Sequence, residues 1–256
     1  MIEAITIGVL AVTGLAVGSF LNVCIYRLPR RESLAFPSSH CTRCRRPLRW
    51  FENVPVLSWA VLGGRCRTCG AGIGLTYPLV ELTTGLVFVG AYLVYGWTPL
   101  LAVRLLFACA MIVLFVIDLR HRILPNVVTI PGIVAGLAFS AALPPGWLAS
   151  LVGAVVGGGL LFAIAEAYYR LRGVHGLGMG DVKMLAMIGA FLGPQLTMVT
   201  LVLASLAGSA VGIGLIASGR GGMQAALPFG TFLAVGALVA AVSGDAIVAW
   251  YLSFYP

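Results

Sequence analysis

The sequence predicts an all-α, polytopic membrane protein of about eight transmembrane helices, with a small zinc-binding cytoplasmic insertion between the first two. Three observations carry this prediction. Of the 256 residues, 60% are hydrophobic and 9% are charged, with a mean hydropathy of +1.04, whereas soluble domains carry about 25% charged residues. Apolar runs recur along the chain at membrane-spanning length. Four cysteines lie in two pairs within one basic, polar stretch.

The apolar runs are the candidate membrane helices, since a spanning helix needs about 20 apolar residues. They cover residues 5–26, 77–95, 100–118, 126–143, 147–169, 182–192, 195–217 and 227–252. Glycine and proline at 96–99, 144–146 and 193–194 mark tight turns between them. The first run follows Glu3 without a basic segment before it and ends in a basic cluster. We therefore expect it to span the membrane rather than to be a cleaved signal peptide.

The sixth run is unusually short. Residues 182–193 rise only about 18 Å at 1.5 Å per residue, against a hydrocarbon core of about 30 Å. A glycine-rich stretch, residues 173–180, precedes it. Non-helical backbone at membrane depth is tolerated only where protein or a wet cavity surrounds it. This pattern predicts that Asp181 lies well below the membrane surface.

Charge predicts the orientation of the helices. Nine of the 16 basic residues lie in residues 27–67, against Glu32 and Glu52. Such a cluster can bind nucleic acid, but in a polytopic protein the positive-inside rule explains it better. Alternation then places the other short basic loops in the cytoplasm as well: Arg120-His121-Arg122, Arg170-Leu171-Arg172 and Arg220. We expect a first transmembrane helix (residues 1–26), a cytoplasmic zinc-binding domain (27–76) and a seven-helix membrane domain (77–256).

The two cysteine pairs have the spacing of a four-thiolate zinc site. Cys41-x2-Cys44 and Cys66-x2-Cys69 are separated by 21 residues. The loop between them lacks apolar bulk for its own core, and a metal would supply the missing folding energy. Two disulfides are the alternative, which a reducing cytoplasm disfavours. A closed four-cysteine site is structural, because it leaves no open position for water.

Two acids stand within the apolar runs. Asp118 closes the third run, and Asp181 opens the sixth, directly behind Gly178-Met179-Gly180. Charges at membrane depth are costly and indicate function. Two carboxylates about 3 Å apart share a proton, so one can take a proton from water while the other donates one. Alternatively, each is an interfacial helix cap, or the chain is a proton-coupled transporter. No internal repeat supports the transporter.

With these residues the sequence resembles a known family, the bacterial type IV prepilin peptidases, or leader peptidase/N-methyltransferases. Besides the cysteine pairs, the matching motifs are Gly18-Ser19-Phe20-Leu21-Asn22-Val23, Tyr26-Arg27-Leu28-Pro29, Arg49-Trp50, Glu52-Asn53-Val54-Pro55, Tyr77-Pro78 through Glu81, Ile117-Asp118, Leu124-Pro125, Gly178-Met179-Gly180-Asp181-Val182-Lys183 and Pro228-Phe229-Gly230. They run nearly the length of the chain.

The resemblance implies a multi-pass aspartyl endopeptidase of the bacterial inner membrane. It would cleave the leader of type IV prepilins or type II secretion pseudopilins after a glycine, on the cytoplasmic side, and then methylate the new N-terminal residue with S-adenosylmethionine. Peptidase activity without methyl transfer is the alternative. Asp118 and Asp181 match the catalytic aspartates of the family. The expected partners are these substrates and the lipid bilayer, not nucleic acid; oligomeric state stays open.

The resemblance also concerns the metal ligands, and the sequence departs from the family pattern at two positions. Cys41, Cys44, Cys66 and Cys69 match the zinc ligands of the bifunctional members. Asn126 stands where many relatives have an acid, and Thr231 where proline is common. We expect neither Asn126 nor Thr231 to touch the aspartate pair. Glu52, Glu81 and Lys183 are further polar residues, for which a structural role is at least as well supported as a role in methyl transfer.

Overall fold

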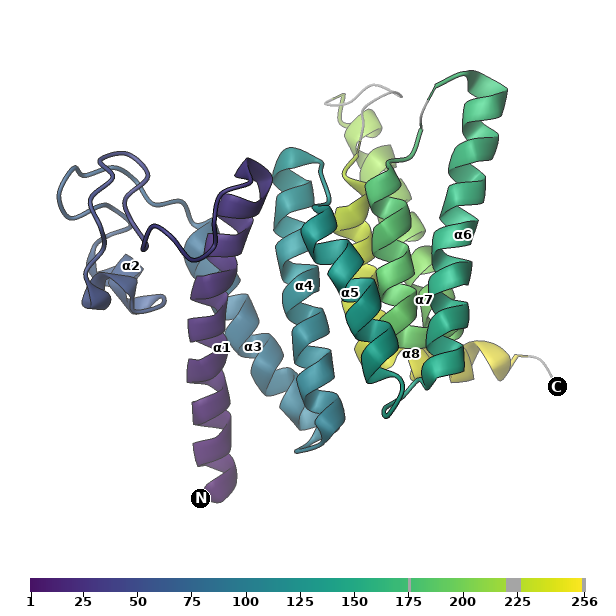
Figure 1. Ribbon diagram of the computed structural model, residues 1–256, viewed down its shortest axis with the longest axis horizontal. Helices are drawn as coiled ribbons and strands as arrows, with labels where there is room; N and C mark the ends of the chain where they lie inside the picture. Colours follow the sequence, from purple (N-terminus) through teal and green to yellow (C-terminus); the bar gives the residue numbers. More distant parts are fainter. Residues whose placement is uncertain (175, 220–226, 255–256) are drawn as a thin grey trace. The chain divides into compact units, whose positions relative to one another are not determined.

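A computed structural model of the chain describes residues 1–174, 176–219 and 227–254. Arg220 and His175, which belong to the orientation prediction and to the glycine-rich stretch, lie outside these residues. The described residues form helices, with two isolated β-bridges, and no strand is found among them. The helices are α1 (Ile2–Arg27), η1 (Leu28–Arg30), η2 (Trp50–Asn53), α2 (Leu57–Val61), α3 (Thr76–Tyr95), α4 (Pro99–His121), α5 (Asn126–Phe139), α6 (Trp147–Arg172), α7 (Met179–Ala217) and α8 (Phe229–Leu252) (Figure 1).

Six of the described helices are long and apolar enough to cross a membrane: α1, α3, α4, α6, α7 and α8. Helix α5 is apolar but has only 14 residues. The all-α membrane fold is confirmed. The count differs from the predicted eight because α5 is short and because α7 contains two of the predicted runs.

Helix α7 reverses direction at Gly193, where φ is 78° and ψ is 173°. A Cβ atom on Gly157 of α6 would lie 2.7 Å from the Leu185 carbonyl oxygen and 3.0 Å from a Thr197 methyl group. Leu185 and Thr197 therefore lie side by side, whereas twelve residues of continuous helix would separate them by about 18 Å. Only glycine adopts this φ readily, and Pro194 after it cannot donate to the preceding helix. The predicted turn between residues 182–192 and 195–217 is confirmed.

The chain forms two compact units, Met1–Val113 and Leu114–Pro256. In the first unit, α1 packs against α3 through small residues. A Cβ on Gly14 would lie 2.8 Å from the Gly85 Cα, and one on Gly18 would lie 2.7 Å from the Glu81 Cα. Glycines spaced by four allow two membrane helices to approach this closely. A hydrogen bond also joins the two helices, because the Asn22 Nδ2 donates to the Tyr77 carbonyl at 3.0 Å.

The second unit is built around the first half of α7. Gly153 of α6 and Gly189 of α7 meet so closely that a Cβ on either would overlap the backbone of the other. The second half of α7 packs against α8, since a Cβ on Gly236 of α8 would lie 2.8 Å from the Thr200 carbonyl oxygen. Met184, Leu185, Met187 and Ile188 are fully buried. Close backbone contact of this kind fixes the start of α7, where Asp181 lies.

The insertion between α1 and α3, residues 27–76, is mostly loop and is tied down by polar contacts. The buried Arg27 guanidinium donates to the carbonyls of Ser33 at 2.8 Å and Pro37 at 2.6 Å. The Val56 N–H donates to the buried Glu81 carboxylate at 2.7 Å. Trp59 packs against Gly64 and donates from Nε1 to the Ile73 carbonyl at 3.0 Å. As expected from its sequence, the insertion has little apolar core of its own.

Candidate active site and metal centre

Asp118 lies in the last turn of α4 and is buried, with 4% of its surface exposed. Its Oδ2 accepts a hydrogen bond from the Thr231 N–H at 2.7 Å and a second from the Thr231 hydroxyl at 3.1 Å. Both donors come from the first turn of α8. A buried carboxylate is tolerated when hydrogen bonds compensate for the lost hydration, and here α8 provides them.

Asp181 lies in the first turn of α7, whose N-cap is Gly178. It is only partly buried, unlike Asp118. Its carboxylate interacts electrostatically with Asp118 and with the backbone N–H groups of Gly178 and Gly230. The Thr231 N–H donates to Asp118 and the preceding N–H, that of Gly230, acts on Asp181, so the start of α8 faces both acids. These N–H groups belong to the positive end of the α8 dipole, which favours anions there.

Small residues let the segments of this site approach one another. A Cβ on Gly230 would lie 3.0 Å from the Asp118 Oδ2 and 2.9 Å from the Leu124 Cδ1. A Cβ on Gly180 would lie 3.0 Å from the Leu124 Cβ. Leu124, in the connection between α4 and α5, thus lies against the starts of both α7 and α8. The site is assembled from four segments of the second unit, and the two acids predicted from the sequence meet in it.

The expectation that Thr231 does not touch the aspartate pair is wrong. Thr231 lies in the first turn of α8 behind the N-cap Pro228, and its N–H is 3.3 Å from the Pro228 carbonyl oxygen but only 2.7 Å from the Asp118 Oδ2. Pro228 before an apolar run is a sequence signal for such a helix start, and it could have indicated these donors. Asn126 has a different place: its Oδ1 accepts from the Lys183 Nζ at 2.9 Å, joining α5 to α7.

The four predicted metal ligands come together in the insertion. The Sγ atoms of Cys41, Cys44, Cys66 and Cys69 lie within 4.8 Å of one another, and those of Cys41 and Cys69 are 3.7 Å apart. All six cysteines are free thiols, so the disulfide alternative is not realised. Thiolates bound tetrahedrally at about 2.3 Å from zinc lie roughly 3.8 Å apart. The group therefore fits a zinc ion.

Both cysteine pairs are held by the same turn. The Cys41 carbonyl accepts from the Arg45 N–H at 2.8 Å, and the Cys66 carbonyl accepts from the Gly70 N–H at 2.9 Å. Arg45 and Gly70 both have the left-handed conformation, with φ of 57° and 66°. Two equivalent turns facing each other present four sulfur atoms to one point, which is the arrangement that a closed structural site needs.

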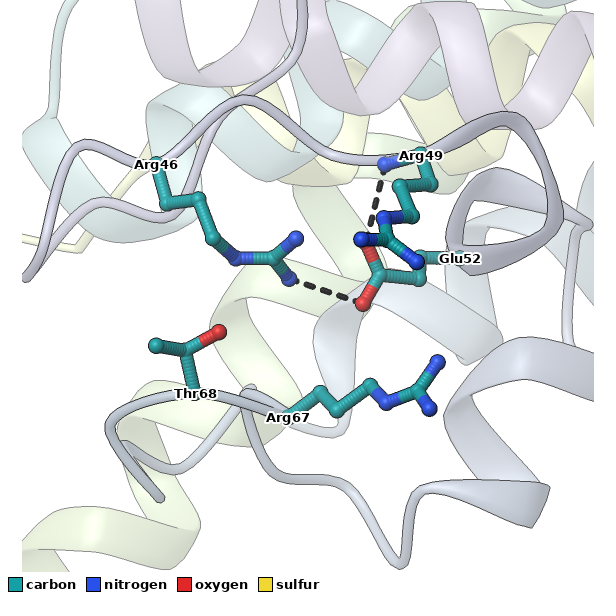
Figure 2. Close-up of a pocket in the computed structure, with 5 residues that line it drawn as sticks. All are labelled: Arg46, Arg49, Glu52, Arg67 and Thr68. Atoms are coloured by element: carbon teal, nitrogen blue, oxygen red, sulfur yellow. Dashed lines mark hydrogen bonds and ion pairs between the residues drawn. The ribbon is translucent and has the colours of Figure 1, made fainter.

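An open cavity of about 360 Å³ lies beside the cysteine pairs, lined by Arg46, Arg49, Glu52, Arg67 and Thr68 (Figure 2). The Arg46 guanidinium points toward Glu52, and its Nη2 donates to the Glu52 Oε1 at 2.7 Å. The Arg49 N–H donates to the other carboxylate oxygen at 2.8 Å. Arg46, and after it the Arg49 N–H, lowers the pKa of Glu52 to about 2. Glu52 is therefore ionised at neutral pH, and it neutralises one of the three arginines.

Each half of the chain matches the model of a known protein family. Residues 12–95, which contain the four clustered cysteines, match the bacterial peptidase A24 N-terminal domain. Residues 105–213, which contain both aspartates, match the type IV leader peptidase family. A prepilin leader peptidase/N-methyltransferase of Aeromonas salmonicida is 39% identical over 93% of this chain and 91% of its own. The chain belongs to this family.

Other relatives of the prepilin leader peptidase/N-methyltransferase family show the same pattern. The protein of that name from Pseudomonas aeruginosa is 35% identical over 94% of this chain and 91% of its own. The one from Myxococcus xanthus is 45% identical over 83% of this chain and 64% of its own. No solved structure is significantly similar to the chain. The family resemblance seen in the sequence motifs is thereby confirmed.

Proposed function

We propose that the chain is a multi-pass aspartic endopeptidase that removes the leader peptide of type IV prepilins or type II secretion pseudopilins, and that it also methylates the new N-terminal residue. One observation carries the peptidase assignment: Asp118 and Asp181, on separate helices, interact with each other and both face the start of α8, where Asp118 accepts two hydrogen bonds from Thr231. The names of the relatives, prepilin leader peptidase/N-methyltransferase, support the substrate and both activities.

In this proposal the two carboxylates share one proton. The Oδ2 of Asp118 already accepts two hydrogen bonds, so the proton is confined to the Asp118 Oδ1 and the Asp181 carboxylate. The ionised group takes a proton from water, which attacks the scissile carbonyl, and the protonated group donates to the carbonyl oxygen. The pair then returns a proton to the leaving amine. Partly exposed Asp181, preceded by Gly178 and Gly180, leaves room for a substrate strand.

The zinc-binding insertion and the aspartates belong on the cytoplasmic side of the inner membrane under this proposal. The positive-inside rule supports that orientation, because nine basic residues lie in residues 27–67. An uncleaved leader would be reached from the same side. Both termini then face outward, so alkaline phosphatase fused to the C-terminus should be active outside the cytoplasm. An inactive fusion at normal expression would contradict this topology.

Two further components follow from the family. Zinc, held by Cys41, Cys44, Cys66 and Cys69, would have a structural role, because four thiolates complete its coordination. S-adenosylmethionine supplies the methyl group of the second reaction. The arginine-lined cavity suits a carboxylate but not the positive sulfonium of that cofactor, since Arg49 and Arg67 keep it basic. We therefore assign no cofactor site and derive no methyl-transfer step through this cavity.

The variants Asp118→Asn and Asp181→Asn test the peptidase, each assayed separately for leader cleavage and for methylation of a previously cleaved substrate. Loss of one acid-base group costs about 10²- to 10⁴-fold in rate, so cleavage should fall at least a hundredfold while methylation persists. Asp245→Asn, at an exposed aspartate of α8, is the matched control. Wild-type cleavage by either active-site variant would refute the pair.

A further inference from the structure

The insertion carries three large apolar side chains that are strongly exposed. Trp50 is 82% exposed, Leu57 is 64% exposed and Val61 is 84% exposed. Leu57 and Val61 are four residues apart in α2, so they lie on one face of that helix. The opposite face of α2 carries Trp59, which packs inward against Gly64 and the Ile73 carbonyl. The apolar residues of α2 are thus divided between an inner contact and an outward-facing surface.

The hydrogen bond between Val56 and Glu81 fixes the depth of this surface. Glu81 is the sixth residue of the membrane helix α3, about 7 Å along the helix from its first residue, Thr76. The start of α2 therefore lies beside the second turn of α3, not beyond its end. Figure 1 shows α2 level with the upper part of α1. Apolar faces of interfacial helices lie about 5–10 Å into the boundary between headgroups and acyl chains, and the distance along α3 from Thr76 to Glu81 is of the same size.

The arginine-lined cavity adjoins the same surface. Arg49 immediately precedes the exposed Trp50, and the Arg67 guanidinium lies over the Phe51 ring, 5.7 Å from its centre. Among the residues that line the cavity, the Arg46–Glu52 ion pair is neutral, and Arg49 and Arg67 are the two positive charges that Glu52 does not neutralise. Guanidinium groups bind phosphate oxygens in pairs, and basic residues are attracted to anionic lipid surfaces. Tryptophan is enriched at the same interface.

From this geometry we infer that the insertion docks on the bilayer, with Trp50, Leu57 and Val61 in the interfacial layer and an anionic phospholipid headgroup in the cavity between Arg49 and Arg67. Apolar depth and charge complementarity favour a lipid over a protein partner. Docking would hold the four-cysteine site at a fixed height beside the membrane end of α1 and α3. This inference concerns a binding surface, so it does not depend on the proposed peptidase reaction.

Photocrosslinking in vesicles tests the docking surface. The photoreactive residue p-benzoylphenylalanine replaces Val61 in the full chain, reconstituted with zinc into vesicles of phosphatidylglycerol and phosphatidylcholine. The control places it at Thr42, an exposed polar position of the first cysteine turn. We expect lipid adducts from position 61 and several-fold fewer from position 42. Equal yields, or adducts from position 61 only to the chain itself or to a second copy, would overturn the inference.

The yield of the lipid adduct from position 61 also tests the role of Arg49 and Arg67. Arg49→Gln and Arg67→Gln should each lower the yield with phosphatidylglycerol about fivefold, the effect expected of one basic residue at an anionic membrane surface. Arg43→Gln, at an exposed arginine outside the cavity, should leave it unchanged. Stoichiometric zinc in every variant shows that the insertion is folded. An unchanged yield in both cavity variants would rule out the headgroup site.

Discussion

In the insertion, four thiols and a few polar contacts hold loops with little apolar core, whereas at the aspartate site Asp181 lies on a helix in close glycine contact with α6 and the Asp118 carboxylate lies against Gly230 of α8. The cysteine cluster depends on Arg27, Glu81 and Trp59 to anchor loops. The aspartate site depends on Gly153, Gly189 and Gly230, where added side chains would collide with neighbouring atoms. From this comparison we expect that the first site needs its metal in order to form, while helix packing and the hydrogen bonds from α8 organise the second.

Metal removal should give the largest difference between the two sites. Structural zinc contributes about 10–16 kcal/mol of binding free energy in small domains. A chelator should therefore abolish hydrogen-exchange protection in residues 40–73 while leaving α6 and α7 protected. Leader cleavage should persist, and methyl transfer should be lost if it uses the insertion. Exchange measured by mass spectrometry, with zinc added back as the control, checks this result. Simultaneous opening of α7 would contradict the independence of the two sites.

The variant Gly189→Ala tests the aspartate site. Its Cβ would overlap the Gly153 backbone, so α6 and α7 must separate. Overpacking of this kind costs about 1–3 kcal/mol or more, and we expect a lower melting temperature together with weaker cleavage. Gly159→Ala is the matched control, since a Cβ there meets no atom within 4 Å. Zinc content should be normal in both variants. If Gly189→Ala behaves like its control, glycine packing is not what organises the site.

A smaller effect is expected from Thr231→Val, which removes the hydroxyl donor to Asp118 and keeps the N–H donor. A hydrogen bond to a charged group contributes about 1.5–3 kcal/mol, so kcat for cleavage should fall about tenfold or more, with KM little changed. Thr231→Ser should restore the rate. Thr200→Val is the control, because the Thr200 hydroxyl donates only within its own helix, to the Leu196 carbonyl. A loss of rate in Thr231→Ser equal to that in Thr231→Val would argue against a role for the Thr231 hydroxyl in cleavage.

The sequence predicted those features that short segments determine. Apolar runs located the helices, Gly193-Pro194 located the reversal in α7, and the two Cys-x2-Cys pairs located the metal cluster. Each of these signals depends on residues close together in the chain. The glycine-rich stretch was predicted less well at its end, because α7 already begins at Met179.

Contacts across the fold were not predicted. Thr231 and Asp118 are separated by 113 residues, and their hydrogen bonds exist only because α8 starts beside the end of α4. Similarly, Glu81 gave no local indication that it would accept the Val56 N–H and so set the depth of α2. Asp118 was recognised as unusual from its apolar surroundings and Glu81 was noted only as a further polar residue, but the partners of both depend on tertiary packing. That Asp118 and Asp181 are catalytic stays a prediction.

The smallest predicted effect compares the two cysteine turns with each other. Gly70 and Arg45 hold equivalent left-handed positions, and a non-glycine residue there costs about 1–2 kcal/mol. Gly70→Ala should weaken zinc binding about tenfold by this strain alone, because its Cβ would meet no atom within 4 Å. Gly72→Ala, equally open but without a positive φ, is the control. Arg45→Gly should bind zinc no more weakly than the unchanged protein, because it replaces a non-glycine residue that already bears the strain of a positive φ. Competition with a chromogenic chelator measures all three, and equal affinities for Gly70→Ala and Gly72→Ala would show that the metal tolerates distortion of its turns.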